Sequence, residues 1–165
     1  MPLPDRTGAE VGVDLCIKRG DLDDPAVIDL IRFHMETNVA VTPVGSVHAL
    51  DLSALRHPTI RFFAGYEHNR LLVIGAWKRH DDILGEVKSM RVVESERGRG
   101  LGKAILSHIE ADAKVAGVKQ LSIETGSFDY FEPARKLYRQ AGYVECLPFA
   151  DYELDPNSVF MTKLL

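Results

Sequence analysis

Arg97-Gly98-Arg99-Gly100-Leu101-Gly102-Lys103 lies between a β-rich run and a segment of helical periodicity. Its three glycines at alternate positions let the backbone turn sharply and bring successive N–H groups toward a ligand. The helix that follows adds the partial positive charge of its N-terminus, and two arginines and a lysine add formal charge. The stretch therefore predicts a binding site for a pyrophosphate, with all seven residues as candidate contacts.

Two other phosphate-binding patterns can be tested against the same residues. A dinucleotide fingerprint GxGxxG that begins at Gly98 requires glycine at position 103, where the chain has Lys103. A P-loop GxxxxGK[ST] that ends at Gly102-Lys103 requires glycine at 97 and Ser or Thr at 104, where the chain has Arg97 and Ala104. Both patterns are excluded.

The segments on either side of this turn predict one α/β domain over residues 1–165, with residues 1–12 expected to be poorly ordered. Period-two and period-four apolar patterns, turn residues and capping signals define the expected elements. The expected strands cover 13–18, 60–66, 71–77, 86–93, 121–125, 143–146 and 159–163. The expected helices run over 24–38, 53–57, 101 to the stop at Gly117, and 133–141. Their order, β-α-α-β-β-β-α-β-α-β-β, predicts a mixed sheet (α+β) with helices on both faces.

Composition excludes several classes of function. A net charge of −4 and a pI near 5.9 argue against a nucleic-acid partner, which requires a basic face. The sequence contains no apolar run of about 20 residues and no signal-peptide pattern, so we expect neither a membrane span nor a signal peptide. Cys16 and Cys146 form no CxxC, which suggests a reduced, cytoplasmic protein, and we expect each to be a buried apolar residue. The six histidines show no HExxH pattern, so no metal site is expected.

Two motifs resemble the GNAT superfamily of N-acetyltransferases. Arg97, Gly100 and Gly102 match its [RQ]xxGx[GA] turn, and residues 134–143 (ARKLYRQAGY) match its A-x-x-L-Y-x-x-x-G-[FY] helix in the expected order. The stretches SVHALDL, EVKSMRV, ETGSFDYFEPARKLY and PFADYELDPNSVFMTK are similar to a YsnE-like branch of small bacterial acetyltransferases. The chain departs from many members at residues 131–133 (Phe-Glu-Pro), where those members carry Asn.

The resemblance implies an acyl-CoA N-acyltransferase fold with a splayed central sheet. It also implies acetyl-CoA as co-substrate and direct attack by the amine of a small-molecule acceptor in a ternary complex. The backbone of Met90, Arg91 and Val92 would pair with the pantetheine arm. Superfamily members are often dimers, which leaves a homodimer open. Two other functions also remain open: a CoA-binding regulatory module, and a protein or peptide N-acetyltransferase in which residues 42–50 line an open groove.

Tyr138 is the candidate acid, because the resemblance directs its hydroxyl at the thioester sulfur. Glu86 is the candidate base, because it precedes Arg97 by eleven positions (97 − 86 = 11), the offset of the base in histone-type members. Strand alternation places Glu86, Lys88, Met90 and Val92 on one face. A structural Glu86–Lys88 pair, or ordered water as the base, remains an alternative.

Lys88 is also a candidate for substrate binding. A cation on this face would repel substrate amines unless it meets an anion. That anion is either Glu86 or a carboxylate of the acceptor, to which Ser46 and His48 would then add hydrogen bonds.

Overall fold

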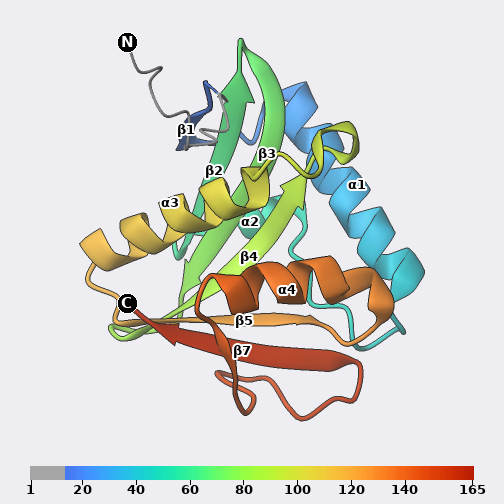
Figure 1. The fold of residues 1–165 in the computed structure, drawn as a ribbon, viewed down its shortest axis with the longest axis vertical. Helices are drawn as coiled ribbons and strands as arrows, with labels where there is room; N and C mark the ends of the chain where they lie inside the picture. Colours follow the sequence, from blue (N-terminus) through green and yellow to red (C-terminus); the bar gives the residue numbers. More distant parts are fainter. Residues whose placement is uncertain (1–13) are drawn as a thin grey trace, which may run out of the picture.

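The computed structural model describes residues 14–165, so the expectation for residues 1–12 lies outside the described part. Its strands form one seven-stranded sheet in the order β1-β2-β3-β4-β5-β7-β6 (Figure 1). The strands are β1 Cys16–Arg19, β2 Ile60–Glu67, β3 Arg70–Arg79, β4 Leu84–Val92, β5 Gln120–Gly126, β6 Val144–Glu145 and β7 Ser158–Leu164. Neighbouring strands are antiparallel except for β4 and β5, which are parallel. The mixed sheet predicted from the sequence is confirmed.

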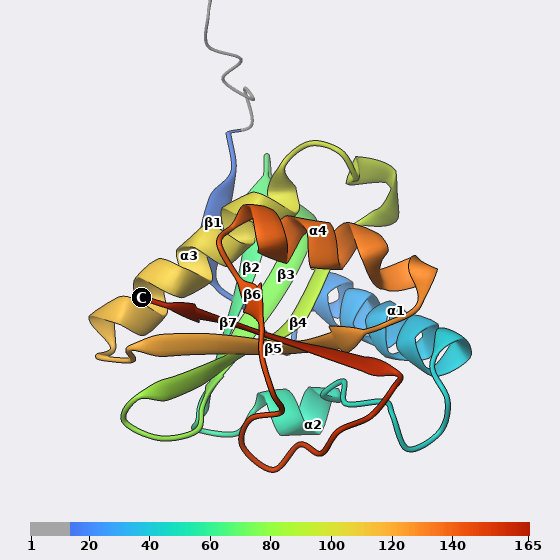
Figure 2. The same cartoon turned by 60° about the horizontal axis from the view of Figure 1, so that its bottom comes forward.

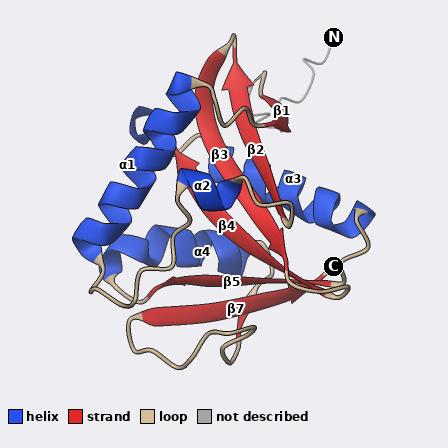
Figure 3. Ribbon diagram, turned by 180° about the vertical axis from the view of Figure 1, so that it is seen from behind, coloured by secondary structure: helices blue, strands red, loops and turns tan. Residues whose placement is uncertain are grey.

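Two helices cover each face of the sheet (Figure 3). The helices are α1 Pro25–Val41, α2 Leu52–Leu55, α3 Leu101–Val115 and α4 Glu132–Gln140, with single 3₁₀ turns at Glu94–Glu96 and Asp129–Phe131. Val27 and Ile31 of α1 pack with Leu55 of α2 on one face. Ile105 and Ile109 of α3 are fully buried against the other face. The predicted element order is confirmed, and the boundaries differ by up to three residues.

Local chemistry explains where these elements begin and end. The side chain of Asp24 caps α1 by accepting from the N–H of Ala26, and Pro25 occupies the first turn. The β2–β3 hairpin turns at His68 and Asn69, whose φ angles of 48° and 63° are those of a tight primed turn. Cys16 differs from expectation, because β1 lies at the sheet edge and leaves this side chain exposed, and Cys146 is only half-buried.

A β-bulge in β4 changes which side chains share a face. Ala76 of β3 pairs with Lys88 and Ile74 pairs with Arg91, so three steps along β4 match two steps along β3. The extra residue turns at Ser89, which has a φ of 56°. Lys88 and Arg91 therefore share the face covered by α1 and α2. The expectation from simple alternation is wrong here, because Met90 and Val92 pack with α3 on the opposite side.

The sheet opens between its two parallel strands. Pairing between β4 and β5 covers only three residue pairs, from Leu84–Gln120 to Glu86–Ser122. Beyond this point the strands diverge, β4 running toward α1 and β5 staying beside β7 (Figures 1 and 2). The side chains and backbone on either side of the divergence line the main cleft described below.

Candidate active site

A cleft of about 580 Å³ extends from the 97–103 turn, along the end of β4, to the loop before α2. Of the candidate residues, the cleft is lined by Ser46, His48, Lys88, Met90, Arg91, Val92, Arg97, Gly98, Gly100, Leu101, Gly102, Lys103 and Tyr138. Arg99 and Glu86 are the two candidates that do not line it. The structure thus brings the turn, the splayed strand and the tyrosine of the second motif to one cavity.

The turn has the backbone geometry that its glycines predict. Gly98 and Gly100 have φ angles of 81° and 78°, in the left-handed region that favours glycine. Gly102 has ordinary φ, but a Cβ there would lie 3.1 Å from the Cδ2 atom of Leu137, so α3 and α4 approach closely at this point. Arg97 and Lys103 form no ion pair with any described residue, which leaves both cations available to phosphate.

Arg99 has a different place from the one expected of it. Its guanidinium donates to the carboxylates of Glu96, at 2.5 Å, and Glu67, at 2.7 Å. Arg70 also pairs with Glu96, at 2.7 Å. The side chain of Arg99 thus connects the turn to the β2–β3 hairpin, and only its backbone remains near the predicted phosphate site.

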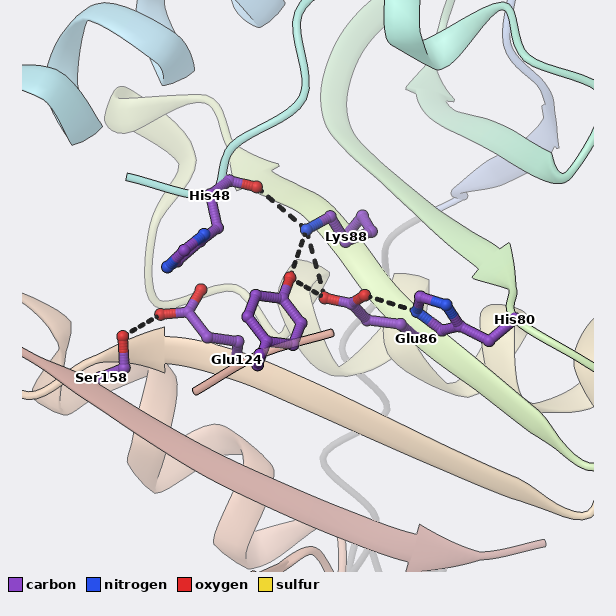
Figure 4. Close-up of polar contacts among 7 residues, drawn as sticks. His48, His80, Glu86, Lys88, Glu124 and Ser158 are labelled. Atoms are coloured by element: carbon purple, nitrogen blue, oxygen red, sulfur yellow. Dashed lines mark hydrogen bonds and ion pairs between the residues drawn. The ribbon is translucent and has the colours of Figure 1, made fainter. Parts of the chain in front are cut away.

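Glu86 lies at the centre of a buried polar cluster (Figure 4). One carboxylate oxygen accepts from Nε2 of His80 at 2.8 Å, and the other accepts from the Tyr152 hydroxyl at 2.6 Å and from Lys88 at 3.2 Å. Burial raises the pKa of Glu86, but the hydrogen bonds and the Lys88 charge outweigh it, and the pKa lies below its ordinary value. Glu86 is therefore ionised at neutral pH, and it borders a second cavity of about 610 Å³.

Lys88 has all three of its N–H donors engaged in this cluster. They bind Glu86, the Tyr152 hydroxyl at 3.0 Å and the backbone carbonyl of His48 at 3.0 Å (Figure 4). An ammonium group has no further donor to offer. The contact with Glu86 is thus present, although Lys88 also lines both cavities.

The loop that carries Ser46 and His48 is attached to the segment before β7. The Ser46 hydroxyl donates to Asp155 at 2.5 Å and accepts from the Asn157 amide at 3.2 Å. His48 packs edge-on against the Tyr152 ring, with 5.0 Å between ring centroids. Residues 46–49 therefore form a wall of the cleft at the end away from the phosphate turn.

Tyr138 is 7% exposed and packs against Tyr143, yet its hydroxyl forms no hydrogen bond with any residue of 14–165. Burial raises the pKa of Tyr138 to about 12, with Glu124 adding to the rise and Arg91 opposing it. The phenol therefore stays protonated through the physiological range. Its hydroxyl can donate to a group in the cleft.

Glu124 on β5 is a cleft residue that the sequence argument missed. Its carboxylate accepts from the Ser158 hydroxyl at 2.8 Å and extends into the space near His48 (Figure 4). Burial raises the pKa of Glu124, and nearby Glu86 also raises it, against the opposing effects of Ser158, His48 and Lys88. The available signal was alternation along residues 121–125, which places Ser122 and Glu124 opposite the apolar Leu121 and Ile123.

A second unforeseen group surrounds Arg91. Its Nε donates to Nδ1 of His34 at 2.9 Å, and its Nη1 donates to the Tyr130 hydroxyl at 3.0 Å. Burial, assisted by the charges of Arg91 and Lys88, lowers the pKa of His34 to about 3. All three side chains line the cleft.

Neither a metal centre nor a membrane segment is found in the described part of the chain. Among residues 14–165, no three His, Cys, Asp or Glu side chains are grouped closely enough to bind a metal ion. The helices of the same region are too short or too polar to cross a bilayer.

Comparisons with known proteins give the family. Residues 58–145 match the model of the acetyltransferase (GNAT) domain. The chain is 46% identical to the uncharacterised N-acetyltransferase YsnE of Bacillus subtilis, over 90% of this chain and 99% of the relative. It is 42% identical to the uncharacterised N-acetyltransferase YedL of Escherichia coli, over 90% and 94% of the two chains.

A solved structure agrees with these relatives. The crystal structure of a protein described as an acyl-CoA N-acyltransferase of Klebsiella pneumoniae superimposes with a TM-score of 0.78 at 29% identity, covering 92% of this chain and 98% of that one. The glycine turn at 97–103, the splayed strands and the tyrosine in the cleft lie where the resemblance implied them. The chain belongs to the GNAT family and is an acetyl-CoA-dependent N-acetyltransferase.

Proposed function

We propose that this enzyme transfers the acetyl group of acetyl-CoA to the amine of a small-molecule acceptor, by direct attack in a ternary complex. The observation that carries the proposal is the single cleft of about 580 Å³, with the phosphate turn at one end and polar side chains beneath residues 46–49 at the other. The hydrogen bonds of Ser46 to Asp155 and Asn157 attach the loop at that end to the segment before β7. A loop fixed in this way favours a small acceptor over an extended peptide.

The residues of the cleft fit acetyl-CoA. The N–H groups of the glycine turn, the N-terminus of α3, Arg97 and Lys103 would bind the pyrophosphate. The unpaired edge of β4 at Met90–Val92 would receive the pantetheine arm, because β5 has left that edge. The cofactor supplies an activated acyl group on a thiol leaving group.

Glu124 fits the role of general base better than Glu86 does. An amine attacks only in its neutral form, so a base must remove a proton from the ammonium. A base works best when its pKa is near the working pH; the environment raises the pKa of Glu124 and lowers that of Glu86. Glu124 also lines the cleft, whereas both oxygens of Glu86 accept from neighbouring side chains.

The chemistry then balances with two side chains. Glu124 takes a proton from the acceptor ammonium, and the amine nitrogen bonds to the thioester carbon. The C–S bond breaks, and the Tyr138 hydroxyl gives its proton to the leaving sulfur. The nitrogen then loses its second proton, which restores the Tyr138 hydroxyl, and Glu124 releases its proton to solvent. Of the two predicted catalytic side chains, Tyr138 lines the cleft and Glu86 does not, and the Tyr138 hydroxyl has no hydrogen-bond partner among residues 14–165. Holding both substrates together supplies most of the remaining rate enhancement.

The test is a steady-state assay of thiol release with acetyl-CoA and a panel of amines, amino acids and peptides. With the best acceptor, Glu124→Gln should lower kcat about 10²–10⁴-fold, the usual effect of losing a general base, with unchanged affinity for acetyl-CoA. In the parent, kcat/KM should fall as the pH drops through the pKa of Glu124, above the ordinary 4.5. Glu124→Gln should lose this limb.

Two results would count against the proposal. If Glu124→Gln stays within twofold of the parent while Glu86→Gln loses a thousandfold, the base is Glu86. If CoA thiol is released only when a peptide is supplied as the acceptor, the natural acceptor is a polypeptide.

A further inference from the structure

The guanidinium of Arg91 is a buried cation without a counter-ion. Arg91 is 8% exposed, and no carboxylate among residues 14–165 forms an ion pair with it. Arg135 has the same exposure but pairs with Glu132 at 2.7 Å and donates to two backbone carbonyls. The cost of burying the Arg135 charge is offset by its partners within the fold, whereas the cost of burying the Arg91 charge is not offset by any described carboxylate.

The two partners of Arg91 are neutral acceptors. An arginine has no lone pair to offer, so Nδ1 of His34 must be the unprotonated nitrogen, and the proton lies on Nε2. The amide Nδ2 of Asn38 lies 3.2 Å from that Nε2. Because both would be donors in this tautomer, we assign the Asn38 amide with Oδ1 and Nδ2 exchanged, so that its oxygen accepts. The second partner of Arg91 is the Tyr130 hydroxyl, which accepts from Nη1. These contacts, and the Phe33 ring whose centroid lies 5.7 Å from Cζ, orient the guanidinium, but none of them supplies a negative charge from residues 14–165.

These contacts use two of the five N–H groups of Arg91, one on Nε and one on Nη1. Three N–H groups are still free to bind a ligand: one on Nη1 and both on Nη2. Nη2 is not among the described side-chain atoms that are both fully buried and without a hydrogen-bond partner. Because Arg91 lines the cleft, its Nη2 donors are available to a ligand there. A planar guanidinium held by its Nε and Nη1 is well suited to bind a carboxylate.

The bulge at Ser89 gives Arg91 its position. Without the extra residue, Arg91 would point toward α3, where Met90 and Val92 pack. With it, Arg91 lies on the same face as Lys88, and the cleft there is lined by His34, Asn38 and the 46–49 loop. The donors of Lys88 are already occupied, so of the two cations that line the cleft from this face, Lys88 and Arg91, only Arg91 retains free donors among the described residues.

We propose that the acceptor carries a carboxylate, which binds Arg91 while its amine lies toward Glu124. The acceptor class is then an amino acid or a related amino-carboxylate. This inference rests on the small-molecule function proposed above and assigns its substrate class. Arg91 would act through its side chain, in addition to the backbone role expected for it in binding the pantetheine arm.

The experiment measures binding without turnover. The protein is saturated with CoA, and calorimetry compares each of the twenty common L-amino acids and β-alanine with its own carboxamide. Acid and amide share the amine and the side chain, so their difference reports the carboxylate alone. We expect at least one acid to bind the parent tenfold or more tightly than its amide. Arg91→Met should bind the pair equally, and Arg91→Lys should keep a reduced preference.

The double variant Glu86→Gln/Lys88→Met is the matched control. It removes Lys88, the other cation that lines the cleft from this face, together with its partner Glu86, so the variant leaves neither member of that pair buried without the other. It should keep the preference for the acid. Melting curves of all variants, with and without CoA, verify that each is folded.

Three results would overturn the inference. The parent binds no acid better than its amide, or Arg91→Met keeps the preference, or Arg91→Met weakens CoA itself tenfold, which would assign the guanidinium to a cofactor phosphate. Failure of the general-base assignment would show instead in thiol release by Glu124→Gln, which this binding experiment does not use.

Discussion

The role of Tyr138 as general acid can be tested by removing a single oxygen atom, in the variant Tyr138→Phe. Its ring packs in the core and its hydroxyl lacks a partner among residues 14–165, so Tyr138→Phe removes little packing. We expect unchanged affinity for acetyl-CoA and a kcat lower by about 10²–10⁴-fold, the usual contribution of a general acid. Tyr143→Phe is the control, because that ring is adjacent and does not line the cleft. A loss of only twofold in Tyr138→Phe would assign the residue to packing.

Glu86 should determine stability more than rate. Its pKa is below the ordinary 4.5 in the folded protein, so the ionised carboxylate stabilises the fold above that pH. This stabilisation is lost as the pH falls through the lower folded-state pKa. Glu86→Gln leaves Lys88 without its partner, and we expect a loss of about 3–5 kcal/mol at pH 7.

Urea unfolding of the parent and Glu86→Gln between pH 7 and pH 3 measures this difference. The gap in free energy of unfolding should narrow as the pH falls, since the parent carboxylate becomes protonated. Asp29→Asn removes an exposed partner of Arg32 and should change stability by less than about 0.5 kcal/mol. A constant gap at every pH would contradict an ionised Glu86.

At the scale of an element, the phosphate turn depends on glycine for two separable reasons. Gly100 has a left-handed φ of 78°, and a Cβ atom there would meet no atom within 4 Å beyond its two chain neighbours. Gly100→Asp therefore adds strain and places a negative charge where the pyrophosphate should bind. We expect CoA to bind at least tenfold more weakly, about 1.4 kcal/mol, by calorimetry.

Gly117, at the other end of α3, provides a matched control. Its φ is 92°, its surroundings are equally free of contacts, and it does not line the cleft. Gly117→Asp should lose stability from the same backbone strain but bind CoA like the parent. If both variants lose the same affinity, strain rather than charge at the phosphate site is the cause.

The elements themselves could be predicted because their signals are local. Pro25, Gly117, Pro133 and Gly142 mark helix boundaries through properties of one residue each. The faces of β4 could not be predicted, because one residue at Ser89 shifts the alternation and only its pairing with β3 reveals the shift. Arg91 was missed as a cationic site residue for the same reason, and Glu124 was missed although alternation along β5 places it opposite Leu121 and Ile123. Their roles depend on Ser158, His34 and Tyr130, which the fold brings from distant positions.

For the whole molecule, the cofactor should behave as part of the fold. A ligand that binds only the native state at one hundred times its Kd adds about 2.7 kcal/mol of stability. For a chain of this size that corresponds to roughly 5–10 °C in Tm. Thermal melting with acetyl-CoA should show this increase in the parent and a smaller one in Gly100→Asp at the same concentration. An equal increase in both would place the phosphates elsewhere.

Only three residue pairs connect β4 to β5, so the sheet consists of two halves, β1–β4 and β5–β7–β6, joined by a short paired segment. Among residues 90–92 on the unpaired edge of β4, backbone amides that face away from β3, such as that of Val92, should exchange with deuterium quickly in the free enzyme, whereas those of the central β3 should exchange slowly. Acetyl-CoA would slow exchange along that edge by bonding to it as a strand does. Bound acetyl-CoA would then connect the two halves of the sheet. After the products leave, only the short β4–β5 pairing connects them, so the free enzyme should be more flexible than the enzyme during the reaction.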